Sequence, residues 1–254
     1  GLDLIYFSIP CTEKDFDIVI QSLSKINCKG LNITIPFKEK VLNYCSQISP
    51  LAEQIKAVNT LKPNGKGAWH GTNTDVEGFI YPLKNFNFIN KQAIILGSGG
   101  AARSAIQGLI NLKISKIIVI SRNQTSLNSL LKDFKNQHLI KGISFKNGNI
   151  INLINSTDLI VNTTPVGMTN HSSTKEKLPF GDNFWTSLNS KTIIYDLIYN
   201  PQETPLINFS RKKGCQTING MKMLCAQGAK SLSYWTDGLE IPIEIMEEAI
   251  KKYL

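Results

Sequence analysis

Apolar positions in the first part of the chain alternate between short continuous runs and helical spacing. The run at residues 4–9, which ends before a proline, predicts a strand, and residues 12–26 carry apolar side chains at the spacing of an amphipathic helix. A second strand is predicted at residues 31–35, and Pro36 can occupy the first turn of a helix that runs through Val41. This alternation of strands and helices predicts a largely parallel sheet.

A second alternation begins near residue 91 and has the order expected of a nucleotide-binding domain. Strands are predicted at residues 91–96, 116–120, 158–162 and 192–197, and helices from a glycine-rich turn to about 111 and at 125–134. A strand, a glycine-rich turn, a helix and a second strand in this order are typical of a doubly wound domain. The final stretch, residues 221–254, predicts two helices separated around Gly238 and Pro242. The predicted fold class is therefore α/β.

The positive charge of the chain first suggests a nucleic-acid partner, but its composition argues against one. The 254 residues carry a net charge of +9, yet 25 of the 28 basic residues are lysine and they are scattered along the sequence. Recognition of base edges favours arginine, whose planar guanidinium donates two hydrogen bonds side by side. We interpret the lysines as a solvated surface with a mild attraction for anionic ligands.

Cysteine, histidine and apolar residues set further limits on the function. The five cysteines form no CxxC pair and the three histidines share no motif with them, so reduced thiols, a cytoplasmic location and no metal are expected. No apolar run approaches the roughly 20 residues that a membrane-spanning helix needs. The chain opens at Gly1 within what resembles folded sequence, so we expect that an N-terminal piece is missing.

The turn at residues 97–102 has the form GxGxxA between a predicted strand and a predicted helix. Gly97 would permit the tight turn, Gly99 would let the backbone approach a pyrophosphate, and Ala102 would allow close packing of the helix. The N–H groups at the start of the helix would then hold the anion. Tight packing alone is the alternative explanation, and the order of the surrounding elements favours dinucleotide binding.

The residues after the second strand of this domain indicate which dinucleotide is bound. NAD-binding domains usually place a carboxylate there, which accepts hydrogen bonds from the ribose 2′-hydroxyl. This chain instead has Ser121, Arg122 and Asn123. A guanidinium can pair with a 2′-phosphate, so NADP is favoured over NAD. The alternative is that Arg122 is an ordinary surface arginine.

Polar residues in the first part of the chain form a second candidate site. Asn32 and Thr34 are two apart on a predicted strand and would share one face, and Lys38 follows Pro36 in the predicted helix. Asp75 could simply cap the next helix, and Lys38 could simply face solvent. A carboxylate beside Lys38 would instead hold its ammonium group and tune its proton affinity, as reduction of a carbonyl requires. The residues leave open whether Lys38 and Asp75 pair.

Taken together, these motifs resemble the shikimate dehydrogenase family over nearly the whole chain. The resemblance is carried by residues 32–38 (NITIPFK), 57–61 (AVNTL), 71–75 (GTNTD), 97–101 (GSGGA), 162–168 (NTTPVGM), Asp196, 199–201, 204–206 and 219–227. The family normally has an upstream strand and a pair of serines that grip the substrate carboxylate, and this chain begins after that region. It also often has a second basic residue near the position of Arg122, which this chain lacks.

The resemblance implies NADP-linked reduction of 3-dehydroshikimate to shikimate in aromatic amino-acid biosynthesis. Lys38 would be the catalytic acid or base, with Asp75 as its partner and as a substrate ligand. Further substrate ligands would be Asn32, Thr34, Asn59, Tyr199 and Gln227. The cofactor would be bound by Gly97, Ser98, Gly99, Gly100, Ala101, Ser121, Arg122, Asn123 and Thr163, with Leu197, Gly220 and Met223 beside the nicotinamide.

The family architecture implies two domains. Residues 1–75 and 221–254 would form a parallel α/β substrate domain, on which the C-terminal helices pack back, and residues 76–220 a Rossmann-like NADP-binding domain. The expected partner is a small-molecule substrate, without nucleic acid or membrane. The oligomeric state is left open, with a homodimer as one option. Two alternatives remain open: a quinate/shikimate dehydrogenase with relaxed substrate or cofactor choice, and a non-catalytic dinucleotide sensor.

Overall fold

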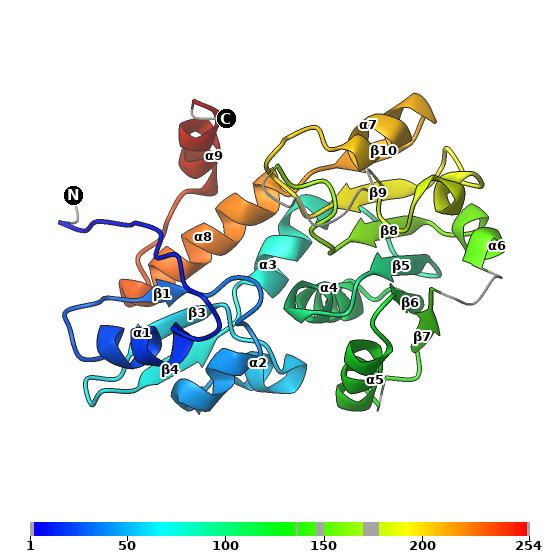
Figure 1. Ribbon diagram of the computed structural model, residues 1–254. Helices are drawn as coiled ribbons and strands as arrows, with labels where there is room; N and C mark the ends of the chain where they lie inside the picture. The colour runs from blue at the N-terminus through cyan, green and yellow to red at the C-terminus, as the bar shows by residue number, and fades with distance from the viewer. Residues whose placement is uncertain (1–2, 136, 146–149, 170–177, 253–254) are drawn as a thin grey trace.

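The computed structural model describes residues 3–135, 137–145, 150–169 and 178–252, which form two sheets with helices packed around them (Figure 1). The first sheet belongs to the N-terminal part of the chain, and the second lies in the middle of the sequence. The α/β class expected from the sequence is confirmed.

The first sheet has four strands in the order β1-β3-β4-β2, with bounds Leu31–Asn32, Thr60–Pro63, Trp69–Thr72 and Cys45–Ile48. β2 pairs with β4 in parallel, but β3 is antiparallel to both β1 and β4. The expectation of a parallel sheet in this domain is therefore wrong. β3 and β4 are joined by a five-residue loop, residues 64–68, in which the N–H of Asn64 donates to the carbonyl of Ala68 at 3.0 Å and Gly65 has a φ of +75°. A short loop of this kind folds two neighbouring strands into an antiparallel hairpin.

Three short helices cover the first sheet: α1 (Phe16–Leu23), the 3₁₀ helix η1 (Lys40–Tyr44) and α2 (Pro50–Ile55). They share a core built of Phe16, Ile20, Ile33, Phe37, Val41, Ala52, Val58, Leu61 and Trp69. The helix expected from Pro36 through Val41 is wrong, because residues 35–39 form turns and Lys38 lies in them, before η1. The backbone carbonyl of Lys38 accepts a hydrogen bond from the N–H of Val58 at 2.8 Å, so it is engaged by another element rather than by a helix.

The strand expected at residues 4–9 is also wrong. These residues belong to no strand, and their apolar side chains are exposed, with Ile5 88% accessible. An apolar run becomes a strand only where a neighbouring strand satisfies its backbone. Within the described residues the only strand that pairs with β1 is β3, and nothing pairs with residues 4–9.

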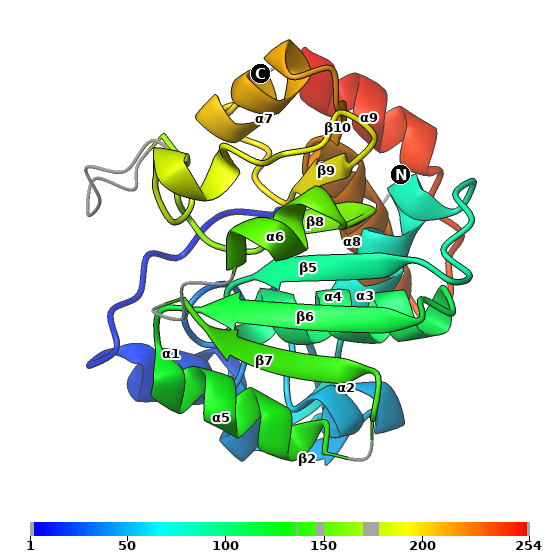
Figure 2. The same ribbon diagram turned by 90° about the vertical axis from the view of Figure 1, so that its right-hand side faces the viewer.

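The second sheet has six parallel strands in the order β10-β9-β8-β5-β6-β7 (Figure 2). Their bounds are β5 Gln92–Leu96, β6 Lys116–Ser121, β7 Ile140–Ser144, β8 Leu159–Asn162, β9 Ile193–Asp196 and β10 Gln216–Ile218. This is the doubly wound order, in which the chain reverses direction across the sheet between β5 and β8. The four strands expected from the sequence are confirmed. β7 and β10 were not expected, because one contains a glycine and the other is only three residues long.

Helices cover both faces of the second sheet. α4 (Gly100–Asn111) and α5 (Gln124–Asp133) pack on one face, while α6 (Ile150–Asn155) and α7 (Pro205–Lys212) pack on the other. In Figure 2, α6 lies over β8, and α3 (Asp75–Ile80) and α4 lie behind the sheet. Two 3₁₀ helices, η2 (Tyr81–Leu83) and η3 (Asp182–Trp185), complete the described elements of this region.

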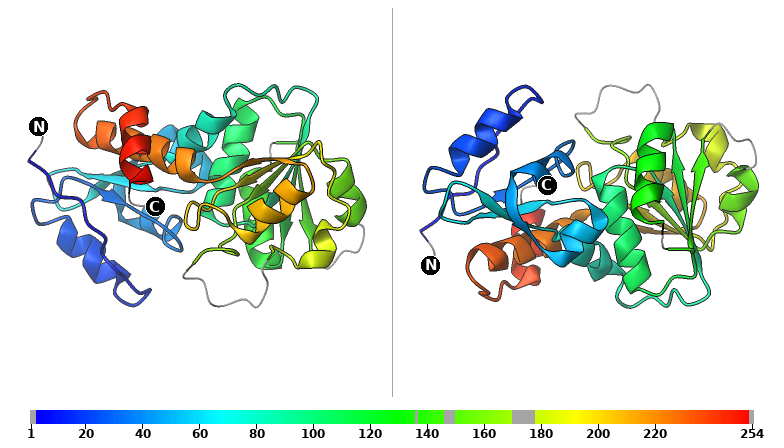
Figure 3. Two further views of the ribbon diagram at one scale, coloured as in Figure 1. Left: turned by 90° about the horizontal axis from the view of Figure 1, so that it is seen from above. Right: turned by 90° about the horizontal axis from the view of Figure 1, so that it is seen from below.

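The first of the two C-terminal helices returns to the first sheet, as expected, and the second packs on the first. α8 (Met221–Trp235) and α9 (Ile243–Lys251) are separated by a segment that contains Gly238, and α8 runs between the two sheets (Figure 1). The indole N–H of Trp235 donates to the carbonyl of Leu61 in β3 at 2.8 Å. Figure 3 shows the blue N-terminal segment and the red C-terminal helix on the same side of the molecule. The two sheets are thus tied together by α8.

Candidate active site

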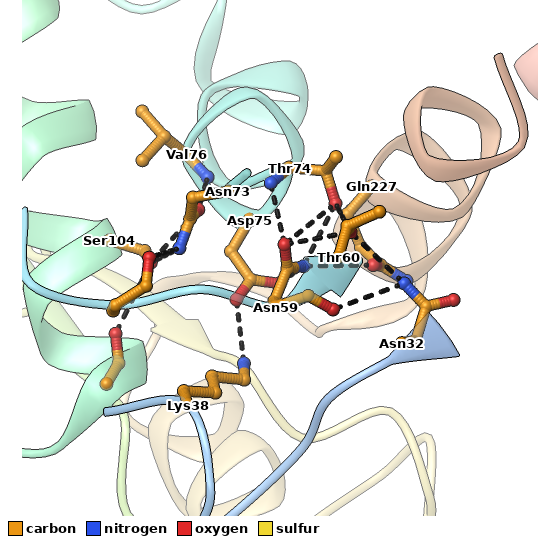
Figure 4. A network of polar contacts seen from close by, with 12 residues as sticks. Asn32, Lys38, Asn59, Thr60, Asn73, Thr74, Asp75, Val76, Ser104 and Gln227 are labelled. Carbon is orange, nitrogen blue, oxygen red and sulfur yellow. Dashed lines mark hydrogen bonds and ion pairs between the residues drawn. The ribbon is translucent and has the colours of Figure 1, made fainter. Parts of the chain in front are cut away.

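Lys38 and Asp75 form an ion pair where the first domain meets the second. Lys38 Nζ lies 2.7 Å from Asp75 Oδ2, and the two side chains are only 14% and 6% exposed (Figure 4). Lys38 comes from the turns after β1, and Asp75 is the first residue of α3. The question left open by the sequence is therefore answered: the two residues pair, and Lys38 does not simply face solvent.

The carboxylate of Asp75 is held by Asn59 as well as by Lys38. Asn59 Nδ2 donates to Asp75 Oδ1 at 2.8 Å and to Thr74 Oγ1 at 2.9 Å, and it lies 3.4 Å from Gln227 Oε1. Asn59 Oδ1 accepts from the N–H of Thr74 at 2.8 Å. This set of donors and acceptors fixes the orientation of the buried Asn59 amide, and Asp75 thus receives one donor on each oxygen.

The explanation of Asp75 as a helix cap is wrong. Asp75 lies inside the first turn of α3, and its side chain is turned toward Lys38 and Asn59. Asn73 serves the helix start instead, because its Oδ1 accepts from the N–H of Val76 at 3.2 Å. The carboxylate of Asp75 is therefore free of a capping role.

Asn32 joins the same network from β1. Its Nδ2 donates to Ser231 Oγ in α8 at 2.9 Å, and its Oδ1 accepts from the hydroxyl of Tyr6 at 3.1 Å. Ser231 is fully buried and also contacts the hydroxyls of Thr60 and Thr74, at 2.8 and 3.0 Å. The first sheet, α3 and α8 thus converge on one polar cluster.

The structure brings together five of the seven substrate residues expected from the sequence. Asn32, Lys38, Asn59, Asp75 and Gln227 are the five that meet in this network. Thr34 and Tyr199 are exposed, and neither has a side-chain hydrogen bond to this cluster in the described part of the chain.

Sequence reasoning missed several members of the cluster, namely Tyr6, Thr60, Thr74 and Ser231. The Asn-Thr pair at 59–60 and the threonine of the pair at 73–74 enter the network, whereas Asn73 bonds to Ser104 in α4 and to the carbonyl of Ala57. Ser231 follows Gln227 by one helical turn, and that spacing places both on one face of α8.

The glycine turn follows β5, next to the point between β5 and β8 where the strand order of the second sheet reverses. Gly97 has a φ of +108°, and a Cβ atom there would come within 2.7 Å of Thr163 Oγ1, so only glycine fits without strain. A Cβ atom on Gly99 would meet nothing within 4 Å, which leaves its backbone open to a ligand. Thr163 Oγ1 donates to the carbonyl of Leu96 at 2.7 Å and so braces the end of β5. The turn thus has the tight bend and the open backbone that are typical of the glycine turns of doubly wound domains.

Hydroxyl groups join the glycine turn to the end of β6. Ser98 Oγ lies 2.9 Å from Ser121 Oγ and donates to Ser126 Oγ at 3.0 Å. Asn123 caps α5, because its Oδ1 accepts from the N–H of Ser126 at 3.0 Å. The guanidinium carbon of Arg122 lies 5.8 Å from the centroid of the Phe180 ring. Hydroxyls, the N-terminus of α5 and a guanidinium therefore gather at the carboxyl end of β6.

The residues expected beside a nicotinamide also lie together. A Cβ atom on Gly220 would come within 2.0 Å of the carbonyl oxygen of Leu197, so the start of α8 can approach the end of β9 only at a glycine. Met223 follows one turn later in α8 and is buried. Gly100 and Ala101 form the first turn of α4 beside the glycine turn.

The strand that ends at Leu197 carries a buried carboxylate. Asp196 accepts hydrogen bonds from Asn162 Nδ2 at 2.9 Å, from the N–H of Ile198 at 3.2 Å and from Thr204 Oγ1 at 2.6 Å. Burial raises the pKa of Asp196 to about 6, against the opposing effect of these three donors. Asp196 thus holds the turn after β9 through its hydrogen bonds with Ile198 and Thr204. Its carboxyl group ionises at a higher pH than an ordinary aspartate.

The raised pKa of Asp196 has a consequence for stability. Because the folded pKa of about 6 exceeds the ordinary value of 3.8, the unfolded chain ionises first, and the contribution of Asp196 to stability falls as the pH rises from about 4 to about 6. Asp196→Asn removes this titration. The difference in unfolding free energy, wild type minus variant, is therefore expected to fall by on the order of 3 kcal/mol as the pH rises from about 4 to about 6. Urea unfolding of both proteins at several pH values measures the difference. A difference that is independent of pH would contradict the assignment.

Other kinds of site find no support among the described residues. No group of three or more histidine, cysteine, aspartate or glutamate side chains there could hold a metal ion. No described helix is both long and apolar enough to cross a membrane. All five cysteines are unpaired.

A doubly wound parallel sheet with a dinucleotide-type glycine turn, next to a buried Lys-Asp pair, defines the class of dinucleotide-dependent dehydrogenases. The sequence profiles for the shikimate dehydrogenase substrate binding domain and the shikimate 5′-dehydrogenase C-terminal domain match residues 1–61 and 220–251. The chain is 63% identical over 254 residues to the shikimate dehydrogenase (NADP(+)) of Prochlorococcus marinus subsp. pastoris, covering all of this chain and 89% of the relative. It is 35% identical to the shikimate dehydrogenase (NADP(+)) of Synechococcus sp. strain JA-3-3Ab, covering all of this chain and 85% of that protein. This chain belongs to the shikimate dehydrogenase family.

Solved structures agree with this placement. Shikimate 5-dehydrogenase from Thermus thermophilus, in complex with NADP(H) and shikimate, has a TM-score of 0.78 at 26% identity, covering 96% of this chain and 86% of that chain. Quinate dehydrogenase from Corynebacterium glutamicum, in complex with NAD, has a TM-score of 0.79 at 28% identity, covering 94% and 83%. The two-domain α/β fold is thus shared by enzymes that differ in substrate and cofactor.

Proposed function

We propose that this chain interconverts 3-dehydroshikimate and shikimate with NADP as the cofactor, as a step of aromatic amino-acid biosynthesis. The observation that carries the proposal is the 2.7 Å contact between Lys38 and Asp75. The pair lies within a set of amides and hydroxyls suited to a polyhydroxylated substrate. The similarity to NADP-dependent shikimate dehydrogenases extends over the whole chain.

Bound NADPH supplies the hydride that reduces the substrate carbonyl. The oxygen of that carbonyl then gains a proton, and Lys38 is the group that gives it, while Asp75 holds the ammonium in place. In the reverse direction Lys38 takes the proton from the substrate hydroxyl. The proposed ligands of the hydroxyls and the carboxylate are Asn32, Thr34, Asn59, Asp75, Tyr199 and Gln227.

The proposal assigns the nucleotide to the second domain. Gly97, Ser98, Gly99, Gly100 and Ala101 would hold the pyrophosphate, with Thr163 bracing the turn. Ser121, Arg122 and Asn123 would take the 2′-phosphate, and Leu197, Gly220 and Met223 would lie beside the nicotinamide. The boundaries proposed for the domains are 1–75 with 221–254 for the substrate domain, and 76–220 for the NADP-binding domain.

The location and assembly of the protein are part of the same proposal. Five unpaired cysteines support a reducing compartment, and the cytoplasm is the location proposed. Homodimer formation stays a prediction, which light scattering of the purified protein would test.

Oxidation of quinate with NAD is the second candidate function. It is favoured by the similarity to a quinate dehydrogenase in complex with NAD and by the single arginine at the proposed 2′-phosphate position. Values of kcat/KM for shikimate and quinate, each with NADP and with NAD, separate the two candidates. The first predicts the highest value for shikimate with NADP, and a higher value for quinate with NAD would contradict it.

Replacement of Arg122 by glutamine is expected to lower kcat/KM for NADP by about 10- to 100-fold, because a charge-assisted hydrogen bond to phosphate is worth about 1.5–3 kcal/mol. The value for NAD should stay within about twofold, since NAD lacks the 2′-phosphate. Arg211→Gln is the control, because Arg211 pairs with Glu203 on the surface. Equal losses for NADP and NAD in the Arg122 variant would exclude a role in choosing the cofactor.

A further inference from the structure

One face of α4 carries a stripe that faces the first domain. Its members recur at the spacing that places side chains on one side of a helix. They are Gly100, Arg103, Ser104 and Gln107. Their contacts in the first domain are with Lys38, Glu39, Gln54, Ile55 and Asn73. The helix that begins at the glycine turn is therefore also the surface against which the first domain packs (Figure 1).

Arg103 is the charged member of this stripe and is 1% exposed. Its Nη1 lies 2.7 Å from Asp133 Oδ2 at the end of α5 and donates to the carbonyl of Ile55 at 3.2 Å. Its Nη2 lies 3.5 Å from Glu39 Oε2. Asp133 belongs to the second domain, and Ile55 and Glu39 belong to the first. A buried guanidinium is costly unless its partners are in place, so Arg103 favours the arrangement in which both domains supply them.

Glu39 directly follows Lys38 in the chain, and both residues rest on the first turn of α4. A Cβ atom on Gly100 would come within 3.0 Å of Lys38 Cβ and 3.3 Å of Lys38 Cδ, so the aliphatic part of Lys38 lies directly against that glycine. One turn further along α4, Arg103 holds the Glu39 carboxylate. Two consecutive residues of the Lys38 segment thus contact the helix that begins at the glycine turn.

We propose that Arg103 is a positioning residue, which holds the Lys38 segment against α4 through Glu39 and so couples occupation of the dinucleotide turn to the placement of Lys38. This inference rests on the proposed function. In this proposal, binding of the dinucleotide restricts the motion of the start of α4. Because Arg103 of α4 contacts Glu39, the motion of the neighbouring Lys38 is restricted as well. Substrate binding at Lys38 and dinucleotide binding at the turn then strengthen each other, since a coupling between two sites is reciprocal.

The test is the affinity for shikimate with and without saturating NADPH, a pair that binds together without reacting. In the wild type we expect NADPH to tighten shikimate binding by on the order of 5- to 50-fold. Glu39→Gln, which removes the charge held by Arg103, is expected to bring this factor to within about twofold of one and to lower kcat by about 10-fold. Its affinities for NADPH alone and for shikimate alone should stay within about twofold, a split that general destabilisation would not produce.

Glu77→Gln is the matched control, because Glu77 is a similarly exposed carboxylate that pairs with Lys230 and not with Arg103. It should keep the wild-type coupling. Arg103→Lys, which keeps the charge but loses the guanidinium fork, should reproduce the loss seen in Glu39→Gln. A coupling factor that survives in Glu39→Gln and Arg103→Lys, or one that is absent in the wild type, would overturn the inference. A wild type that does not bind shikimate at all would instead overturn the proposed function.

Discussion

Replacement of Lys38 by methionine is expected to lower kcat for shikimate oxidation by about 10²- to 10⁴-fold, the range typical of a lost general acid or base. Methionine keeps an unbranched apolar stem of similar size against Gly100, so the packing at the start of α4 is retained. What is lost is the group that exchanges a proton with the substrate oxygen. Initial rates of NADPH formation at saturating substrate measure the effect.

Lys40→Met is the matched control for this variant. Lys40 lies two residues further along, and it pairs with Asp17 at 2.6 Å on the surface of the same domain. We expect its kcat to stay within about twofold of the wild type. The affinity of the Lys38 variant for NADP, measured by protein fluorescence, should also be unchanged, because no contact of Lys38 with the glycine turn involves its charge. Turnover of the Lys38 variant within tenfold of the wild type would rule out proton transfer by Lys38.

Replacement of Asp75 by asparagine is expected to cause the second-largest loss, about 10²-fold in kcat/KM for shikimate. Each oxygen of Asp75 now receives a donor, Lys38 Nζ at 2.7 Å and Asn59 Nδ2 at 2.8 Å. Asparagine has only one acceptor oxygen, so its NH₂ group would face one of these donors. Either Lys38 loses its anchor or the amide of Asn59 must turn, and both changes displace proposed substrate ligands.

Kinetics and thermal unfolding of the Asp75 variant separate a local effect from a general one. We expect a rise in KM for shikimate together with a fall in kcat, while KM for NADP stays unchanged. Asp17→Asn, which breaks the exposed pair with Lys40, is the control and should leave kcat/KM unaltered. An Asp75 variant with wild-type kcat/KM would show that the ion pair with Lys38 serves only the structure of the first domain.

The nucleotide-binding part of the fold was predictable from the sequence because its signals are local. A parallel strand buried on both faces is a continuous apolar run, as in β5 and β6, and the glycine turn follows such a run directly. The tight turn expected at Gly97 is confirmed, because Gly97 has the positive φ that only glycine adopts easily.

The errors arose where distant residues decide the local structure. Residues 4–9 have the composition of a strand, yet no described strand pairs with them. The segment after Pro36 does not continue as a helix, because the carbonyl of Lys38 is bonded to Val58. The sequence did contain a signal for the hairpin of β3 and β4, namely Asn64 followed by Gly65. The prediction of a parallel sheet instead followed the alternation of strands and helices.

The site was only partly predictable for a related reason. Motifs marked Lys38, Asn59 and Asp75, but no pattern in the sequence shows that Ser231 lies beside Asn32, 199 residues away. Arg103 was missed because a charged residue inside an amphipathic helix usually faces solvent, whereas here two domains enclose it.

The most direct test of the proposed activity is the appearance of NADPH absorbance when the purified protein is mixed with shikimate and NADP. The account predicts turnover in the range of about 1–10³ per second, with 3-dehydroshikimate as the product, and a turnover lower by about 10²- to 10⁴-fold for Lys38→Met. Binding of NADP without any turnover of shikimate or quinate would contradict it and would indicate a dinucleotide sensor instead.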